Sequence, residues 1–177
     1  ARLHAGEVNI HKEWQPLEEV IGASIQLLGQ SLEHHVVKVT LPDDLPMLEF
    51  DAVLMERVFC NHLDHAAKYS QAQGGIEFSA CVQGGFVKVT VSDHGCGIPP
   101  DKLEAIFGMF VRGPAAEEAN KIPGTGIGLA VCKAIIEAHQ GSVQAENLAL
   151  GGASISFTLP LGEPPLFNEA LLESELI

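Results

Sequence analysis

The sequence predicts an α+β fold built as a two-layer sandwich, in which helices cover one face of a mixed β-sheet. Two segments show the apolar spacing of amphipathic helices, and several short β-branched runs are typical of strands. These strands do not alternate one-for-one with helices, which disfavours a doubly wound parallel sheet. The chain has 177 residues, 46% of them apolar and 19% charged. This is enough for one domain with a buried core and too apolar for wholesale disorder.

Charge and cysteine content narrow the class of function. Lys and Arg number 10 against 23 Asp and Glu, for a formal net charge of −13. Because such an acidic surface repels phosphate backbones, nucleic acid is a poor partner. The four cysteines, at positions 60, 81, 96 and 132, form no C-x-x-C pair, which favours reduced thiols in a cytosolic setting. No stretch approaches the ~18 apolar residues that a membrane helix needs.

The N-terminal elements begin with a helix over residues 17–28, predicted by apolar residues at helical spacing. Pro16 is suited to open this helix and Gly29 to end it. Residues 1–15 are mixed and turn-like. A β-branched run predicts a short strand over residues 36–41.

The central elements follow the same logic. Residues 47–50 predict another short strand, and Asp51 is a good N-cap for a long helix that runs to about Tyr69. Two β-rich runs, 76–82 and 86–91, flank a Gly-Gly pair and predict a hairpin.

The C-terminal elements include a second strong helix over residues 126–138. Its apolar residues cover more than half of the circumference, so we expect it to be buried. Residues 111–125 predict a loop, because they are polar and rich in Gly, Pro and Ala. The remaining expected elements are a short helix containing Leu103, Ile106 and Phe107, and a final hairpin of strands 143–145 and 153–159.

Two segments carry glycines suited to a nucleotide. Residues 93–99 (DHGCGIP) place a carboxylate at a strand end, where it can accept from an exocyclic amine, and two glycines that let the backbone approach a flat ring. Residues 123–129 (PGTGIGL) lead three alternate glycines into a helix N-terminus, which suits phosphates. Taken singly, each segment is also compatible with an ordinary turn or helix cap.

Two further segments carry polar and aromatic groups. Residues 61–70 (NHLDHAAKYS) put an amide, a carboxylate, an imidazole and an amine on one helical face, which suits a metal–phosphate site. Residues 106–112 (IFGMFVR) place two aromatic residues three apart beside an Arg. A solvated polar stripe and ordinary core packing are the alternative interpretations.

In this order, the four segments resemble the N, G1, F and G2 boxes of the ATP-binding catalytic domain of sensor histidine kinases. These belong to the gyrase/Hsp90/histidine-kinase/MutL superfamily. The resemblance covers roughly residues 15–160 and implies a Bergerat-type ATP-binding fold that uses ATP and Mg²⁺. Flanking segments such as ARLHAGEVNIHKEW and IPGTGIGLAVCKAIIEAHQG resemble the potassium-sensing kinases of this family.

The resemblance also implies a role for each matching position. Asp93 would accept from the adenine amino group, Asp64 would be the catalytic carboxylate, and Lys68 would neutralise phosphate charge. Asn61 and His65 occupy the positions that imply metal ligands. Phe107 and Phe110 would anchor the lid and help to dock the phosphoacceptor domain. The other implied ATP-binding positions are Asn61, Tyr69, Gly95, Gly97, Ile98, Phe110, Arg112, Gly124, Thr125, Gly126, Ile127, Gly128 and Leu129.

The N box departs from the family pattern N-x-x-E-N-A-x-K-Y/F, because Asp64 replaces Glu and His65 replaces Asn. Mg²⁺ prefers oxygen ligands, whereas imidazole prefers softer ions. The shorter Asp withdraws a carboxylate whose position matters for catalysis. Three interpretations stay open: His65 ligates the metal with reduced activity, a water bridges the gap, or the domain binds nucleotide without efficient transfer. His62 also replaces a usually apolar residue.

Other functions than a histidine kinase are also considered, the first of them because of the altered N box. A degenerate nucleotide-binding regulatory module, with little or no transferase activity, is the main alternative. An ATPase of the gyrase or MutL branch is disfavoured by the F box and the short chain. A zinc site at His62, Asp64 and His65 is disfavoured because residues 62 and 64 point to different helix faces.

The resemblance implies an organisation and partners as well. Residues 16–160 would form the catalytic domain, 1–15 a linker from an upstream dimerisation domain, and 161–177 a tail that is either frayed or a docking helix. The phosphoacceptor motif H-E-x-x-[TN] is absent. We therefore expect the acceptor His on the dimerisation domain, and a response regulator as the next partner. The isolated domain is expected to be a monomer and a cytoplasmic part of an inner-membrane sensor protein.

Overall fold

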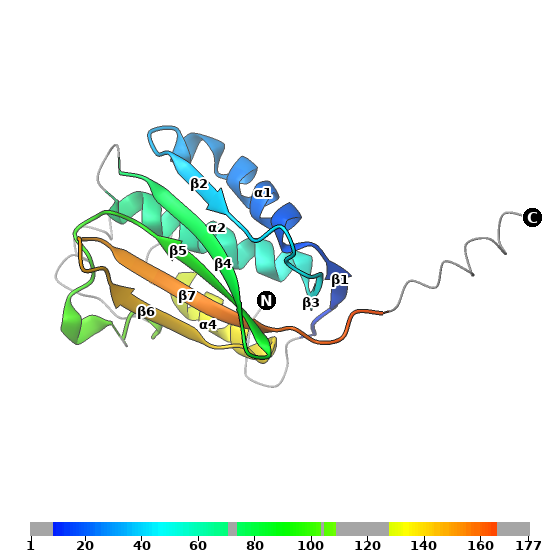
Figure 1. The fold of residues 1–177 in the computed structure, drawn as a ribbon. Coiled ribbons are helices and arrows are strands. Elements are labelled where there is room, and N and C mark those ends of the chain that lie inside the picture. Colours follow the sequence, from blue (N-terminus) through cyan, green and yellow to red (C-terminus); the bar gives the residue numbers. More distant parts are fainter. Residues whose placement is uncertain (1–8, 71–73, 104, 109–127, 166–177) are drawn as a thin grey trace, which may run out of the picture.

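The computed structural model describes residues 9–70, 74–103, 105–108 and 128–165. In these residues, helices pack against a five-stranded sheet, and two short strands form a separate ribbon (Figure 1). The helices are α1 (Leu17–Leu27), α2 (Ala52–Tyr69) and α4 (Gly128–Ala138), with 3-10 turns η1 (Gly29–Leu32), η2 (Pro100–Lys102) and η3 (Ala105–Phe107). The strands are β1 (Glu13–Gln15), β2 (Val37–Thr40), β3 (Leu48–Phe50), β4 (Ile76–Gln83), β5 (Phe86–Ser92), β6 (Val143–Asn147) and β7 (Ala153–Pro160).

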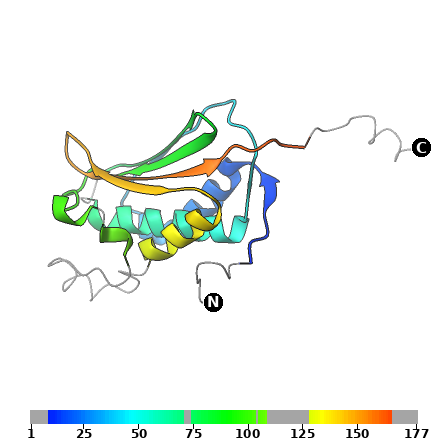
Figure 2. The ribbon, with the colours of Figure 1, turned by 90° about the horizontal axis from the view of Figure 1, so that it is seen from below.

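The larger sheet has the strand order β2-β4-β5-β7-β6. Strands β2 and β4 pair in parallel, and the other neighbours pair antiparallel, so the sheet is mixed as predicted. Viewed from below, the sheet forms one layer and the helices form the other (Figure 2). Alternation along the strands explains this arrangement, because Phe78, Val89 and Phe157 are buried while Lys88 and Thr90 are half-exposed.

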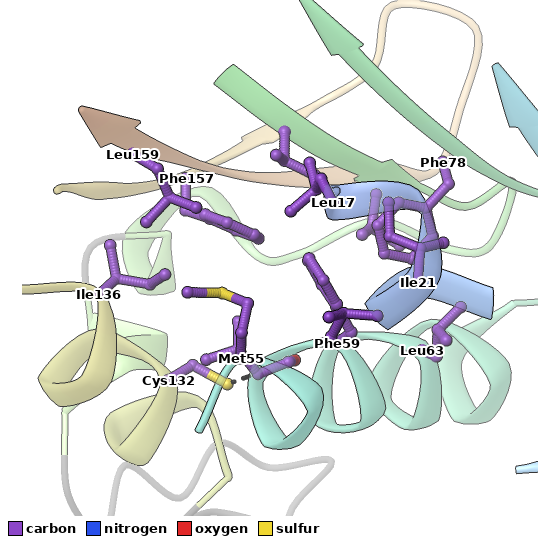
Figure 3. Close-up of a cluster of buried hydrophobic side chains, with 14 of the residues drawn as sticks. Leu17, Ile21, Met55, Phe59, Leu63, Phe78, Cys132, Ile136, Phe157 and Leu159 are labelled. Atoms are coloured by element: carbon purple, nitrogen blue, oxygen red, sulfur yellow. Dashed lines mark hydrogen bonds between the residues drawn. The ribbon is translucent and has the colours of Figure 1, made fainter. Parts of the chain in front are cut away.

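Helix α2 forms the centre of the core. The ring of Phe59 lies 5.4 Å from that of Phe78 and 5.6 Å from that of Phe157, which joins the helix to two strands (Figure 3). Leu17 of α1 and Ile136 of α4 complete the same cluster from either side of α2. Burial of these large apolar side chains is the main force that holds the helical layer to the sheet.

The N-terminus of α2 connects three parts of the chain. Asp51 is its N-cap, and Oδ1 accepts from the backbone N–H of Leu54 at 3.1 Å. Oδ2 accepts from the backbone N–H of His11 at 3.0 Å. The backbone N–H of Asp51 donates to Nε2 of His139, just beyond the end of α4, at 3.0 Å. One capping residue therefore ties the N-terminal segment to both α2 and the C-terminal end of α4.

Most predicted elements are confirmed, and three details differ. Residues 13–15, expected to be turn-like, form β1, which pairs antiparallel with β3. The α-helix α1 ends at Leu27, and Gly29, expected to stop it, is instead the first residue of the 3-10 turn η1. The expected short helix around Phe107 consists of two 3-10 turns.

Other features concern the cysteines and helix length. All four cysteines are free thiols. None of the described helices is both long and apolar enough to cross a membrane.

Candidate functional site

The second half of α2 gathers polar residues of the predicted site. Asn61, Asp64, His65 and Lys68 share one helical face, and all four are partly exposed. Lys68 Nζ lies 2.9 Å from Asp64 Oδ2 as an ion pair. The ring of His65 lies 4.5 Å from the ring of Tyr69. The amide, carboxylate, imidazole and amine expected on this face are thus brought together.

Asn61 connects this face to α4. Its Nδ2 donates to the backbone O of Gly128 at 3.3 Å, and the thiol of Cys132, one turn later in α4, donates to the backbone O of Val58 in α2 at 3.8 Å. Burial raises the pKa of the Cys132 thiol to about 12, so this thiol is protonated at neutral pH. The first turn of α4 therefore lies against the polar face of α2.

Asp93 lies just after the end of β5 and is only 5% exposed. Its Oδ1 accepts from the backbone N–H of Gly95 at 2.8 Å and from that of Ala153 at 3.4 Å. No hydrogen bond from the described residues reaches Oδ2. Oδ1 therefore holds the loop through its two hydrogen bonds, and Oδ2 is available to accept a hydrogen bond from a ligand.

Two glycines let the loop after Asp93 approach its neighbours. A Cβ at Gly95 would overlap the carbonyl oxygen of Tyr69, the last residue of α2. Gly97 has a φ of +77°, and a Cβ there would lie 2.8 Å from Oδ1 of Asn147. The loop therefore packs closely between the end of α2 and the end of β6. A side chain at either glycine would prevent this close packing.

Two imidazoles in this region are held neutral. Burial lowers the pKa of His65 to about 4, although the charges of Asp93 and Asp64 oppose the shift. His62 is 1% exposed, its ring lies 5.6 Å from that of Phe157, and neither ring nitrogen has a hydrogen-bond partner. Burial lowers the pKa of His62 to about 3, and the neighbouring His65 adds to the effect. Both rings are uncharged at pH 7.

The predicted residues Phe107 and Leu129 come together in a second, smaller apolar cluster with Ile155 of β7. This cluster fixes the turn η3 against the start of α4. Six predicted positions lie outside the described residues: Phe110, Arg112, Gly124, Thr125, Gly126 and Ile127.

Sequence reasoning missed Asn147, the last residue of β6. Its Oδ1 accepts from the backbone N–H of Ile98 at 2.7 Å, and its Nδ2 donates to the backbone O of Ile98 at 2.6 Å. The two residues are 49 positions apart, so no local spacing rule could pair them. The only available signal was the polar side chain that ends an otherwise strand-like run.

These contacts bring a buried carboxylate and a polar helical face together at one end of the fold. A family model described as histidine kinase-, DNA gyrase B-, and HSP90-like ATPase matches residues 50–163. The chain belongs to this ATPase family. The resemblance stated from the four boxes is thereby confirmed, and with it the assignment to an ATP-binding domain of the histidine kinase type.

Two curated relatives of this ATPase domain are sensor proteins named KdpD. The one from Escherichia coli (strain K12) is 39% identical over 169 residues, which is 96% of this chain. The one from Clostridium acetobutylicum is 35% identical over 160 residues, which is 90% of this chain. The chain spans only 18% of the length of each relative.

Solved structures confirm the fold of the ATPase domain. The mycobacterial sensor histidine kinase MprB matches with a TM-score of 0.74 at 27% identity, covering 88% of this chain and 100% of that one. The structure of full-length ShkA in complex with AMPPNP matches with a TM-score of 0.76 at 24% identity, covering 93% of this chain and 35% of that one.

Proposed function

We propose that this chain is the ATP-binding catalytic domain of a KdpD-like sensor histidine kinase. The observation that carries the proposal is the convergence of two separate segments, the start of α4 and the loop after Asp93, on the C-terminal half of α2. Asn61 contacts the start of α4, and Gly95, next to the buried Asp93 carboxylate, packs on Tyr69. Relatives named sensor protein KdpD, at 39% and 35% identity, and one named sensor histidine kinase WalK, at 31% identity, support the kinase over the degenerate module.

Nucleotide binding follows from the donors and acceptors at this end. Asp93 Oδ2 accepts from the exocyclic amine of adenine, while Gly95, Gly97 and Ile98 line the base. Lys68 and the N-terminal turn of α4, at Gly128 and Leu129, stabilise the phosphates. Tyr69 packs near the base or sugar. The ShkA structure was solved with AMPPNP, which supports ATP as the ligand of this fold.

The chain's own residues fit Mg²⁺ through a single oxygen. Asn61 Nδ2 is engaged by Gly128, which leaves the Oδ1 atom of the same amide as a hard ligand. His65 offers nitrogen, which Mg²⁺ does not prefer, so a water would take that ligand position when the ion is bound. Mg²⁺ in nucleotide sites keeps several waters and binds the phosphates, so one protein oxygen suffices. When bound, the ion neutralises charge on the β- and γ-phosphates.

The transfer step moves the γ-phosphoryl group to a His on a separate dimerisation domain. A ring nitrogen of that His attacks in line, a P–N bond forms, and the bond to the β–γ bridging oxygen breaks to release ADP. Asp64, held by its ion pair with Lys68, lies on the polar face of α2 and orients the acceptor imidazole. The phosphoryl group then passes to an Asp of a response regulator.

The proposed organisation places residues 16–160 in the catalytic domain and residues 1–15 in a linker from the dimerisation domain. The last linker residues join the fold as β1, paired with β3. Residues 161–177 form a tail. We further propose that the domain is cytoplasmic, belongs to an inner-membrane sensor protein and is monomeric when isolated.

Calorimetric titration with AMPPNP, with and without Mg²⁺, tests the binding half of this proposal. We expect binding that tightens when Mg²⁺ is added. Asp93→Ala should weaken it by at least about tenfold, because a charge-assisted hydrogen bond to the base is lost. Asp44→Ala, in an exposed turn, serves as the matched control. An unmodified chain that fails to bind AMPPNP would overturn the proposal.

Incubation with ³²P-labelled ATP and the dimerisation domain of the E. coli relative tests transfer. Acid-labile label on that domain, absent when its acceptor His is replaced, supports the kinase. Binding of AMPPNP without any label would favour the regulatory module, provided that the relative's own catalytic domain labels the same acceptor. Steady hydrolysis by the chain alone would instead favour the gyrase or MutL branch.

A further inference from the structure

The loop that carries Asp93 is held at both ends by one cross-strand pair of the final hairpin. Asn147 of β6 and Ala153 of β7 are register partners. Ala153 accepts the backbone N–H of Asp93 at 2.9 Å, and its own N–H donates to Asp93 Oδ1 at 3.4 Å. Asn147 binds both backbone groups of Ile98. The end of the hairpin therefore hydrogen bonds to both ends of the loop, at Asp93 and at Ile98.

The Asn147 contact has a geometry that few side chains can reproduce. Oδ1 accepts and Nδ2 donates to the same residue, at 2.7 and 2.6 Å, as a neighbouring strand would do. The absent Cβ of Gly97 leaves the space that this amide fills. An Asp has the same shape but no donor, so its carboxylate would meet the backbone O of Ile98 with like partial charge.

We infer that Asn147 is a positioning residue for base recognition, acting through the 93–98 loop rather than by touching the nucleotide. The inference rests on the proposed function, because it assigns adenine to this loop. Fixing Ile98 fixes the far end of the loop and thereby the place where the base meets Asp93 Oδ2. The hydrogen bonds of the Asn147 side chain within the described residues both go to Ile98, and none goes to the phosphate side on α2 and α4. Loss of Asn147 should therefore reduce selectivity for adenine more than general anion binding.

The test compares ADP and GDP binding, both without metal, for the unmodified chain and for Asn147→Ala and Asn147→Asp. We expect the affinity for ADP to fall by about tenfold, since two hydrogen bonds that fix the loop are lost. The affinity for GDP should change little, so the ratio of the two dissociation constants shrinks. Gln144→Ala, an exposed position on the same strand, is the matched control and should behave as the unmodified chain.

Thermal melting of each variant separates positioning from unfolding. Asn147→Asp keeps the size of the side chain, so it remains informative if Asn147→Ala does not fold. An unchanged ratio of ADP to GDP affinity in a folded Asn147 variant would overturn the inference and leave the proposed function standing. Equal losses for both nucleotides would do the same, since they would indicate a general structural role. An unmodified chain that binds neither nucleotide would overturn the proposed function and the inference together.

Discussion

His65 places an imidazole on the helical face where the proposed metal–phosphate site lies. It packs on Tyr69 and stays neutral because burial lowers its pKa to about 4. Replacing a nitrogen ligand by an oxygen ligand should favour Mg²⁺. We therefore predict that the double variant Asp64→Glu, His65→Asn binds AMPPNP with a larger Mg²⁺ dependence, by about tenfold, in calorimetric titrations. His34→Asn, at an exposed site, is the control; no gain in the double variant would exclude the ligand argument.

His65 lies on the polar face of α2, whereas the ring of His62 is buried in the apolar core. Both of its ring nitrogens are buried without partners, and it packs against Phe157. A buried polar group without a hydrogen bond costs about 1–3 kcal/mol. We predict that His62→Leu raises the free energy of unfolding by about that amount, measured by urea denaturation at pH 7. His34→Leu, which changes an exposed ring, should have little effect, and a destabilised His62→Leu would show that the ring has an unseen partner.

At the scale of elements, the N-cap residue of α2 also hydrogen bonds to the N-terminal segment and to the residue that follows α4. Asp51 accepts from Leu54 within α2 and from His11 in the N-terminal segment. Replacing an N-cap carboxylate by Ala costs about 0.5–2 kcal/mol, and the contact to His11 adds to the loss.

We predict that Asp51→Ala lowers the free energy of unfolding by about 2 kcal/mol. It should also increase hydrogen exchange at the backbone N–H groups of His11 and Leu54. Asp44→Ala removes the same charge from an exposed turn and controls for the change in net charge. Equal stability of the two variants would contradict the capping role.

Elements also differ in how they are stabilised. Strand β1 is three residues long and pairs only with β3, which is equally short. A ribbon of this size is marginal alone, so it depends on Phe50 and Leu48 being fully buried in the main core. The same dependence explains why the sequence of residues 13–15 carries no strand signal of its own.

At the scale of the whole molecule, stability should depend on pH through the buried imidazoles. The pKa of His62 falls from 6.5 to about 3 on folding, and that of His65 falls to about 4. Between pH 6.5 and these values the unfolded chain binds more protons than the folded chain. Stability is therefore fully present above pH 6.5 and is lost as the pH falls, because protons bind to these rings in the unfolded chain before they bind in the folded one.

We predict a marked fall in the free energy of unfolding between pH 7 and pH 5, measured by urea denaturation. His62→Leu should show a smaller slope, because one of the titrating rings is gone. Burial also lowers the pKa of His139, which adds in the same direction. A slope that is the same in His62→Leu and in the unmodified chain would contradict this account.

The fold class and the family could both be predicted from the amino-acid sequence. Apolar spacing located α1, α2 and α4, and β-branched runs located the strands of the larger sheet, because both signals are local and periodic. The residue types of the four boxes identified the family, which the comparisons confirmed. The roles assigned to individual site residues remain predictions.

The contacts that hold the loop after Asp93 became visible in the three-dimensional structure and not in the sequence. Gly95 packs on the end of α2, and Asn147 binds Ile98 from a strand 49 residues away. The pairing of His139 with Asp51 spans 88 residues. Such contacts depend on where separate elements meet in space. The residues that make them have no spacing pattern in the chain, so sequence periodicity locates the elements but not the side chains that join them.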